Sequence, residues 1–171
     1  SESSRKFSKC VQNSIGQNYV LVAKHHLMEI KLLLFVHRRH RGRVGKTEAT
    51  TEATGLGNVV GNKGAVAVKL MLDDTSFCFV SSHLAAHEGA KFLQQRNDAV
   101  VEIMRNLEKN GRTGAPPALH RFHHIIWMGD LNYRLDLARG LPRAANWDHE
   151  VKWKHINNIV QAARYDELAV F

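Results

Sequence analysis

The stretch from Ala65 to Leu84 constrains the fold of this chain more than any other. Two apolar runs, Ala65–Leu72 (AVAVKLML) and Phe77–Leu84 (FCFVSSHL), flank the polar segment Asp-Asp-Thr-Ser. Runs of this length that are rich in Val, Leu and Phe favour β-strands, and an Asp-rich segment between them favours a tight turn. The sequence therefore predicts a β-hairpin that belongs to a buried sheet.

The rest of the chain alternates between further strand and helix patterns. Strands are predicted at Tyr19–Lys24, Glu29–Val36, Lys46–Thr54 (exposed) and Phe122–Met128 (buried), helices at Glu88–Leu107 and Asn146–Ala163, and loops at Arg38–Gly45, Gly55–Gly64 and Lys109–Ala118. Ser1–Gln17 is polar and shows no clear period. This order predicts an α/β (α+β layered) domain, and periodicity alone does not decide between a sandwich and an open sheet.

Composition narrows the class of protein. The 171 residues suit one domain or part of one, and the net charge of +8 favours an anionic partner such as phosphate, nucleic acid or an acidic membrane surface. Composition alone favours a basic surface without a specific partner. The two cysteines, Cys10 and Cys78, lack zinc-site spacing and favour a reduced, intracellular protein.

Two polar clusters each have a plain and a functional interpretation. The glycines around Asn62 and Lys63 (GNKG) would let the backbone approach an anion, although an ordinary loop with a surface lysine is the simpler interpretation. His83 ends a predicted strand, where an imidazole could bind phosphate or move protons, although a structural histidine is the simpler interpretation of this residue alone. His83 and His87 have a spacing that could bind metal only on a helix, which the sequence does not predict.

A third cluster follows the last predicted strand at Gly129. Asp130, Asn132, Tyr133 and Arg134 place an acid, an amide, a phenol and a guanidinium within five residues. A carboxylate at a strand end can take a proton from water, and an amide beside it can fix the geometry or donate to a phosphate oxygen. Four different polar groups at one strand end favour a site over a simple turn.

The polar clusters and their flanking residues together resemble a known family. The stretches GNKGAVAV, FCFVSSHLAAHE, QQRN and WMGDLNYRLDL, in this order and spacing, are similar to an inositol polyphosphate 5-phosphatase domain. The resemblance covers 19–171, behind a polar segment 1–18. It implies the endonuclease/exonuclease/phosphatase fold, in which two packed β-sheets are flanked by helices.

The resemblance also implies a reaction and the residues for it. The reaction is Mg²⁺-dependent removal of the 5-phosphate from inositol polyphosphates or phosphoinositide lipids. By resemblance, Asp130 would orient or deprotonate the attacking water, Asn132 would support Asp130 and contact the phosphate, and His83 would hydrogen-bond the phosphate. No nucleophilic cysteine is required for such an attack by water.

Substrate-binding roles are implied for four further residues. Asn62 and Lys63 would lie near the other phosphate groups of the substrate. Tyr133 and Arg134 would buttress the site, and for Arg134 a structural role without contact to the substrate is an alternative. The motif that contains Arg96 and Asn97 would also lie near the substrate face.

Some family motifs have no counterpart in this sequence. The family's metal-binding Glu on an early strand is not found in Ser1–Asn18, and the later Trp-Cys-Asp-Arg and Asp-His motifs do not occur before Phe171. We therefore expect the central part of a larger domain, with little activity alone and with open sheet edges. Expected partners are inositol phosphates, phosphoinositide head groups and an acidic membrane surface, in the cytoplasm and peripheral at membranes. A Mg²⁺-dependent nuclease of the same superfamily and a non-catalytic phosphoinositide-binding remnant remain alternatives, although nucleic acid is not the expected partner.

Overall fold

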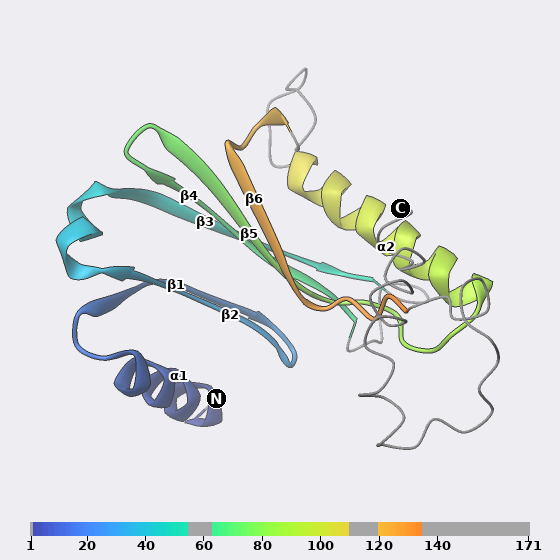
Figure 1. Ribbon diagram of the computed structural model, residues 1–171, viewed down its shortest axis with the longest axis horizontal. Helices are drawn as coiled ribbons and strands as arrows, with labels where there is room; N and C mark the ends of the chain where they lie inside the picture. The colour runs from blue at the N-terminus through green and yellow to red at the C-terminus, as the bar shows by residue number, and fades with distance from the viewer. Residues whose placement is uncertain (1, 55–62, 110–119, 135–171) are drawn as a thin grey trace, which may run out of the picture. The chain divides into compact units, whose positions relative to one another are not determined.

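The computed structural model describes residues 2–54, 63–109 and 120–134 of the chain (Figure 1). In these ranges the elements are α1 (Glu2–Ile15), β1 (Tyr19–Leu27), β2 (Ile30–His37), the 3₁₀ turn η1 (Arg38–Arg43), β3 (Val44–Ala53), β4 (Gly64–Leu72), β5 (Thr75–His83), α2 (Ala90–Lys109) and β6 (His124–Asp130). The predicted helix over Asn146–Ala163 lies outside the described residues. No helix among the described residues is long and apolar enough to cross a membrane.

The backbone divides into two compact units. The first comprises Ser1–Leu84 and Ala99–Leu131, and the second comprises Ala85–Asp98 and Asn132–Phe171. All six strands belong to the first unit, in which β1 and β2 form an antiparallel hairpin and the other four form a sheet in the order β3-β4-β5-β6 (Figure 1). The predicted layered α+β class is therefore confirmed.

The β4–β5 hairpin confirms the strongest prediction from the sequence. The two strands pair antiparallel from Gly64↔His83 to Leu72↔Thr75, so the turn consists of Asp73 and Asp74 alone. Asp73 has a φ of 50°, a left-handed conformation that Asp tolerates better than most residues. Strand β6 then pairs in parallel with β5, and α2 is the crossover between them.

One face of the four-stranded sheet carries the β1–β2 hairpin. Ile30 and Leu32 of β2 form a buried cluster with Val66 and Val68 of β4. Side chains alternate between the two faces of a strand, so the even-numbered residues of β4 turn toward this hairpin. Burial of these four large aliphatic side chains makes this layer the main apolar contact between the two sheets.

The other face is covered within the first unit by the second half of α2. Ile103 and Leu107 are 2% and 1% exposed, and they line a small hollow with Ala65 and Ala67 of β4. The small alanines allow the helix to approach the sheet closely. Lys69 donates from Nζ to the carbonyl oxygen of Leu107 at 3.2 Å, which fixes the end of the helix against the sheet.

Two segments for which the sequence predicted no regular structure are helical. Residues 2–15 form α1, where the prediction of a segment without a period was wrong: Phe7, Val11 and Ile15 recur every four residues. The helix ends at Gly16, which has a φ of 87° and donates its N–H to the carbonyl oxygen of Gln12. The predicted basic loop is likewise the 3₁₀ turn η1, which begins at Arg38 and is followed directly by β3.

Strand β6 is more exposed than the sequence indicated. We predicted a buried strand that ends before Gly129, but the strand runs through Asp130, and Ile126 and Met128 are 36% and 39% exposed. The reason is its position: β6 is the last strand of the sheet among the described residues, and the β1–β2 hairpin contacts β3, β4 and β5. An apolar run therefore indicated a strand correctly but gave no information on whether its faces are covered.

Candidate functional site

Strand pairing brings Lys63, His83 and Asp130 together where β4 begins and where β5 and β6 end. We call this end of the four-stranded sheet the His83 edge. Strands β5 and β6 are parallel, so their last residues His83 and Asp130 are register partners. Strand β4 runs the other way, so its first residue Gly64 also pairs with His83, and Lys63 directly precedes it. The N–H of Leu84 donates to the carbonyl oxygen of Asp130 at 3.0 Å, which closes the two strand ends together.

The side chains of these three residues meet at the His83 imidazole. Lys63 Nζ lies 2.5 Å from His83 Nε2, and Asp130 Oδ2 lies 3.4 Å from the same nitrogen. One ring nitrogen cannot accept a hydrogen bond from the ammonium and donate one to the carboxylate at the same time. His83 therefore has two alternative partners, and an anion that draws Lys63 away would free Nε2 to pair with Asp130.

The electrostatics of the cluster favour an incoming anion. Partial burial lowers the pKa of Lys63, because it costs the ammonium part of its hydration, and the Asp130 carboxylate acts in the opposite direction. A phosphate group beside Nζ would supply further negative charge and favour the ammonium form. The Asp130 side chain is 64% exposed, so water reaches its carboxylate.

Glycines on either side of the cluster permit this close approach of strands. Gly129 has a φ of 123°, and a Cβ at this position would overlap the carbonyl oxygen of Ser82. Gly64 has a φ of 143°, and a Cβ there would overlap the carbonyl oxygen of Glu52. Only glycine adopts such angles without strain. The glycine before Asp130 in the sequence is thus required by the approach of β6 to β5.

A side-chain contact next to the site also joins these two strands. Trp127 Nε1 donates to Ser82 Oγ at 2.8 Å, and Ser82 is 2% exposed. The Trp and the Ser in the motifs that suggested the family therefore support the sheet, one step back from the polar cluster.

The other predicted site residues after β6 belong to the second unit, where they contact one another and α2. Arg134 donates through a terminal nitrogen to Asn132 Oδ1 at 2.8 Å, and Tyr133 donates its hydroxyl to Asn97 Oδ1 at 2.8 Å. Asn132 has a φ of 56°, a conformation in which Asn is enriched. The supporting role that the resemblance implied for Tyr133 and Arg134 stays a prediction. Asn62 lies outside the described residues.

Arg96 is the polar residue of the second unit whose importance the sequence did not reveal. It is completely buried, and it donates to the carbonyl oxygens of Ala85 and His87 at 3.1 and 2.9 Å. Its guanidinium also lies 5.4 Å from the centre of the Tyr133 ring. The sequence offered one signal, the Gln-Gln-Arg-Asn motif, but an arginine on a helix is normally exposed. The motif residues of α2 therefore hold the segments that follow His83 and Asp130 along the chain.

A metal site is not formed by the described residues of the His83 edge. In the parts of the chain that the structure describes, no group of three or more His, Cys, Asp or Glu side chains could hold a metal ion. Of Lys63, His83 and Asp130, only Asp130 provides the oxygen ligands that Mg²⁺ prefers, and an ammonium lies in the same cluster. These three residues do not by themselves fit Mg²⁺, and the chemistry that we derive for them is acid–base and electrostatic.

Comparison with known proteins assigns the chain and its fold to a family. Residues 2–169 match the model of Endonuclease/Exonuclease/phosphatase family 2. The chain belongs to this family. The resemblance to inositol polyphosphate 5-phosphatases is confirmed by relatives that include Synaptojanin-1 of Rattus norvegicus, which is 38% identical over 145 residues, or 81% of this chain. Phosphatidylinositol 3,4,5-trisphosphate 5-phosphatase 2B of Danio rerio is 38% identical over 128 residues, or 74% of this chain.

A solved structure supports the same assignment. The inositol polyphosphate 5-phosphatase domain of SPsynaptojanin, in complex with inositol (1,4)-bisphosphate and calcium ion, matches with a TM-score of 0.69 and 26% identity. The match covers 97% of this chain and 46% of that domain structure. The chain spans 9% of the rat relative and 10% of the zebrafish relative. The fold is therefore that of the family, in agreement with the expectation from the sequence.

Proposed function

We propose that this chain hydrolyses the 5-phosphate of inositol polyphosphates or phosphoinositide lipids, with Mg²⁺ as the cofactor. The observation that carries the proposal is the meeting of Lys63, His83 and Asp130 at one sheet edge, with Nζ and Oδ2 at 2.5 and 3.4 Å from His83 Nε2. Hydrolysis of a phosphate monoester by water requires an anion-binding group, a proton carrier and a carboxylate that water can reach. The ammonium, the imidazole and the exposed carboxylate of this cluster are such groups. The family relatives named as 5-phosphatases support this substrate class.

Each side chain has a role in the proposed reaction. The Lys63 ammonium binds a phosphate oxygen and thereby leaves His83, whose Nε2 can then take up a proton and donate a hydrogen bond to Asp130 or to a second phosphate oxygen. The Asp130 carboxylate orients the attacking water and accepts its proton. Asn132 follows Asp130 by two residues, and its side-chain oxygen Oδ1 accepts a hydrogen bond from Arg134. We assign Asn132 to phosphate contact and Tyr133 and Arg134 to support of the segment.

The cofactor and the cellular partners complete the proposal. The calcium ion in the complex of SPsynaptojanin supports a divalent metal in this family, and Mg²⁺ would supply Lewis-acid stabilisation of charge on the phosphate. Inositol phosphates and phosphoinositide head groups are the proposed partners, with Asn62 and Lys63 near the additional phosphates of the substrate. Action on lipid head groups would place the chain in the cytoplasm at acidic membrane surfaces.

Phosphate release from soluble inositol trisphosphate tests the proposal. The 171-residue chain is assayed with Mg²⁺ and with EDTA, beside Asp130→Asn as the matched variant. We expect Mg²⁺-dependent release, even if slow, that Asp130→Asn abolishes. Release that persists unchanged in Asp130→Asn would contradict the proposed role of the His83 edge.

Two further arms of the same experiment address the alternatives from the sequence. Cleavage of abasic DNA at a rate above that on inositol trisphosphate would identify a nuclease. Binding of inositol trisphosphate in EDTA, with no phosphate release in Mg²⁺, would identify a non-catalytic binding module. Either result would overturn the proposed hydrolysis of inositol phosphates.

A further inference from the structure

A second cluster of cations lies at the other end of the strands of the four-stranded sheet, away from His83. Val44, which follows η1, pairs with Leu72 at the end of β4, whereas the other end of β4 is Gly64 beside Lys63. η1 and the turn between β4 and β5 therefore lie at the same edge, away from the candidate active site (Figure 1). We call this the η1 edge.

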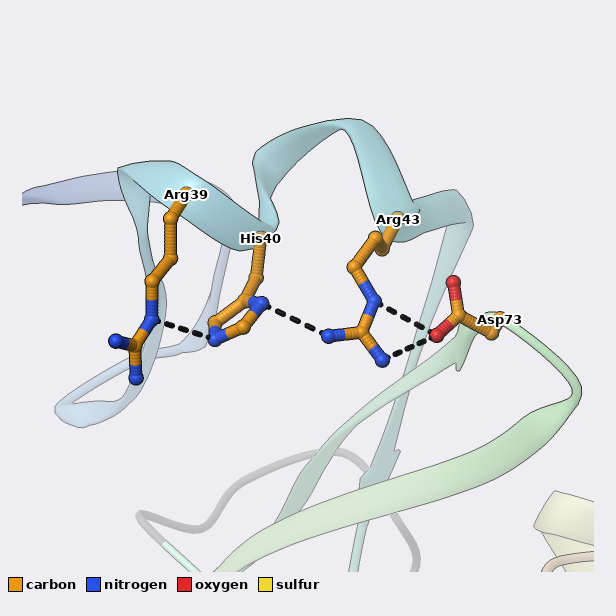
Figure 2. Close-up of polar contacts among 4 residues, drawn as sticks. All are labelled: Arg39, His40, Arg43 and Asp73. Carbon is orange, nitrogen blue, oxygen red and sulfur yellow. Dashed lines mark hydrogen bonds and ion pairs between the residues drawn. The ribbon is translucent and has the colours of Figure 1, made fainter.

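The η1 turn presents arginines that are held in fixed positions. Arg43 forms an ion pair with Asp73 and also contacts His40 Nδ1 at 2.9 Å, while Arg39 donates from Nε to His40 Nε2 at 2.8 Å (Figure 2). Partial desolvation, followed by the charges of Arg39 and Arg43, lowers the pKa of His40 and favours the neutral ring. Asp73 offsets the charge of Arg43, whereas Arg38, Arg39 and Arg41 have exposed side chains in the same turn.

A hollow of about 490 Å³ opens beside this turn. It is lined by Lys9, Gln12, Asn13, Gly16, Gln17 and Arg38, a set with two cations, three amides and no acid. The wall is thus built from residues of α1, of the segment after it and of η1. A side chain or ligand that enters the hollow meets hydrogen-bond donors from all three.

The backbone carbonyls that could repel an anion here already accept hydrogen bonds. The end of a helix carries partial negative charge, so the end of α1 would by itself disfavour an anion. However, Gln12 O accepts from the N–H of Gly16 at 3.2 Å, and Gln17 O accepts from Arg38 Nε at 2.6 Å. The second bond holds Arg38, which lines the hollow, through Nε, one of the five donors of a guanidinium whose planar fork suits a phosphate.

We propose that this hollow, with Lys9 and Arg38 as its cations, is a second site that binds a phosphate group. Arg39 and Arg41 of η1 add positive charge around it. The phosphate can come from a soluble molecule or from a lipid head group, since the chemistry of recognition is the same. The site is independent of the proposed hydrolysis, because it shares no residue with the His83 edge.

An NMR titration of the 171-residue chain with inorganic phosphate in EDTA tests the site, since each backbone amide reports separately. We expect saturable shifts at Gly16, Gln17 and Arg38 that occur equally in a Lys63→Gln background. The double variant Lys9→Gln/Arg38→Gln should bind about tenfold more weakly at these amides. Phosphate-induced shifts confined to the His83 edge would overturn the proposal.

Matched variants separate a site from general positive charge and from misfolding. Lys91→Gln/Arg105→Gln removes the same two charges from exposed positions of α2 and should leave the affinity unchanged. Arg38→Lys keeps the charge but loses the planar fork, so it should bind more weakly than the parent and more tightly than Arg38→Gln. Equal weakening in the α2 double variant would contradict a site in the hollow.

Vesicle sedimentation identifies the source of the phosphate. Phosphatidylcholine vesicles that contain phosphatidic acid are compared with pure phosphatidylcholine vesicles, again in EDTA. Binding that requires phosphatidic acid and is lost in Lys9→Gln/Arg38→Gln would assign a lipid head group. Titration by inorganic phosphate without vesicle binding would assign a soluble ligand.

Discussion

Cations lie at both ends of the strands of the four-stranded sheet, but the two ends are built for different tasks. At the His83 edge, three strand ends contribute one ammonium, one imidazole and one exposed carboxylate, and the imidazole has to choose between the other two. At the η1 edge, one short turn contributes four arginines, and Asp73 of the neighbouring β4–β5 turn is already held by Arg43. Proton transfer needs groups of opposite sign that compete, whereas anion binding needs only donors. The His83 edge is therefore suited to proton transfer and the η1 edge to anion binding.

The largest expected difference between the edges is in turnover. Asp130→Asn removes the proposed base and should lower kcat about 10²–10⁴-fold, whereas Asp73→Asn makes the same chemical change at the η1 edge and should leave kcat unchanged. Steady-state phosphate release measures both variants, and circular dichroism checks that both remain folded. Similar losses in the two variants would end the distinction between the edges.

The two edges should also differ strongly in how much stability a glycine-to-alanine substitution costs. Gly129→Ala places a Cβ against the carbonyl oxygen of Ser82 at a φ of 123° and should cost about 3 kcal/mol of stability. Gly42→Ala, in η1, meets no atom within 4 Å and should be neutral. Denaturant unfolding of both variants gives the comparison, and a neutral Gly129→Ala would mean that β5 and β6 do not approach so closely.

A smaller difference between the edges is expected in the effect of removing a lysine charge on KM. Lys63→Gln removes the ammonium beside His83 and should raise KM about tenfold through loss of a charge-assisted hydrogen bond to phosphate. Lys46→Gln removes an exposed charge near the η1 edge and should leave KM as it is. Initial rates over a range of inositol trisphosphate concentrations give kcat and KM for both variants. A change in kcat alone in Lys63→Gln would contradict the role of Lys63 in binding phosphate.

The smallest expected effect is the pH dependence of the exposed Arg43–Asp73 pair. The hydrogen bond from Arg43 lowers the pKa of Asp73, so the pair stabilises the fold above the ordinary carboxyl pKa of 3.8 and loses this contribution as the pH falls through the lowered value. Asp73→Asn should therefore lose slightly less stability than the parent on acidification. Thermal unfolding between neutral pH and pH 3 tests this, and a larger acid loss in the variant would contradict the sign.

Much of the fold and part of the site follow from local sequence. Alternation and chain length gave the β4–β5 hairpin, the strands around it and most of α2, because these patterns depend on neighbours along the chain. Strand ends also marked His83 and Asp130, since a polar residue after an apolar run leaves the sheet at its edge. The motifs around them led to the family. The predictions for residues 55–62 and 135–171, including Asn62 and the second helix, lie outside the described residues.

Contacts between distant parts of the chain were decided by the tertiary structure. Only the pairing of β4, β5 and β6 places Lys63 against His83 and Asp130, and only packing shows that Arg96 is buried. The exposure of β6 follows from its position at the sheet edge, which its apolar composition did not reveal. A sequence encodes local periodicity directly, but strand order and register arise from the sum of many weak contacts, so the chemistry of the His83 edge exists only once the sheet has formed.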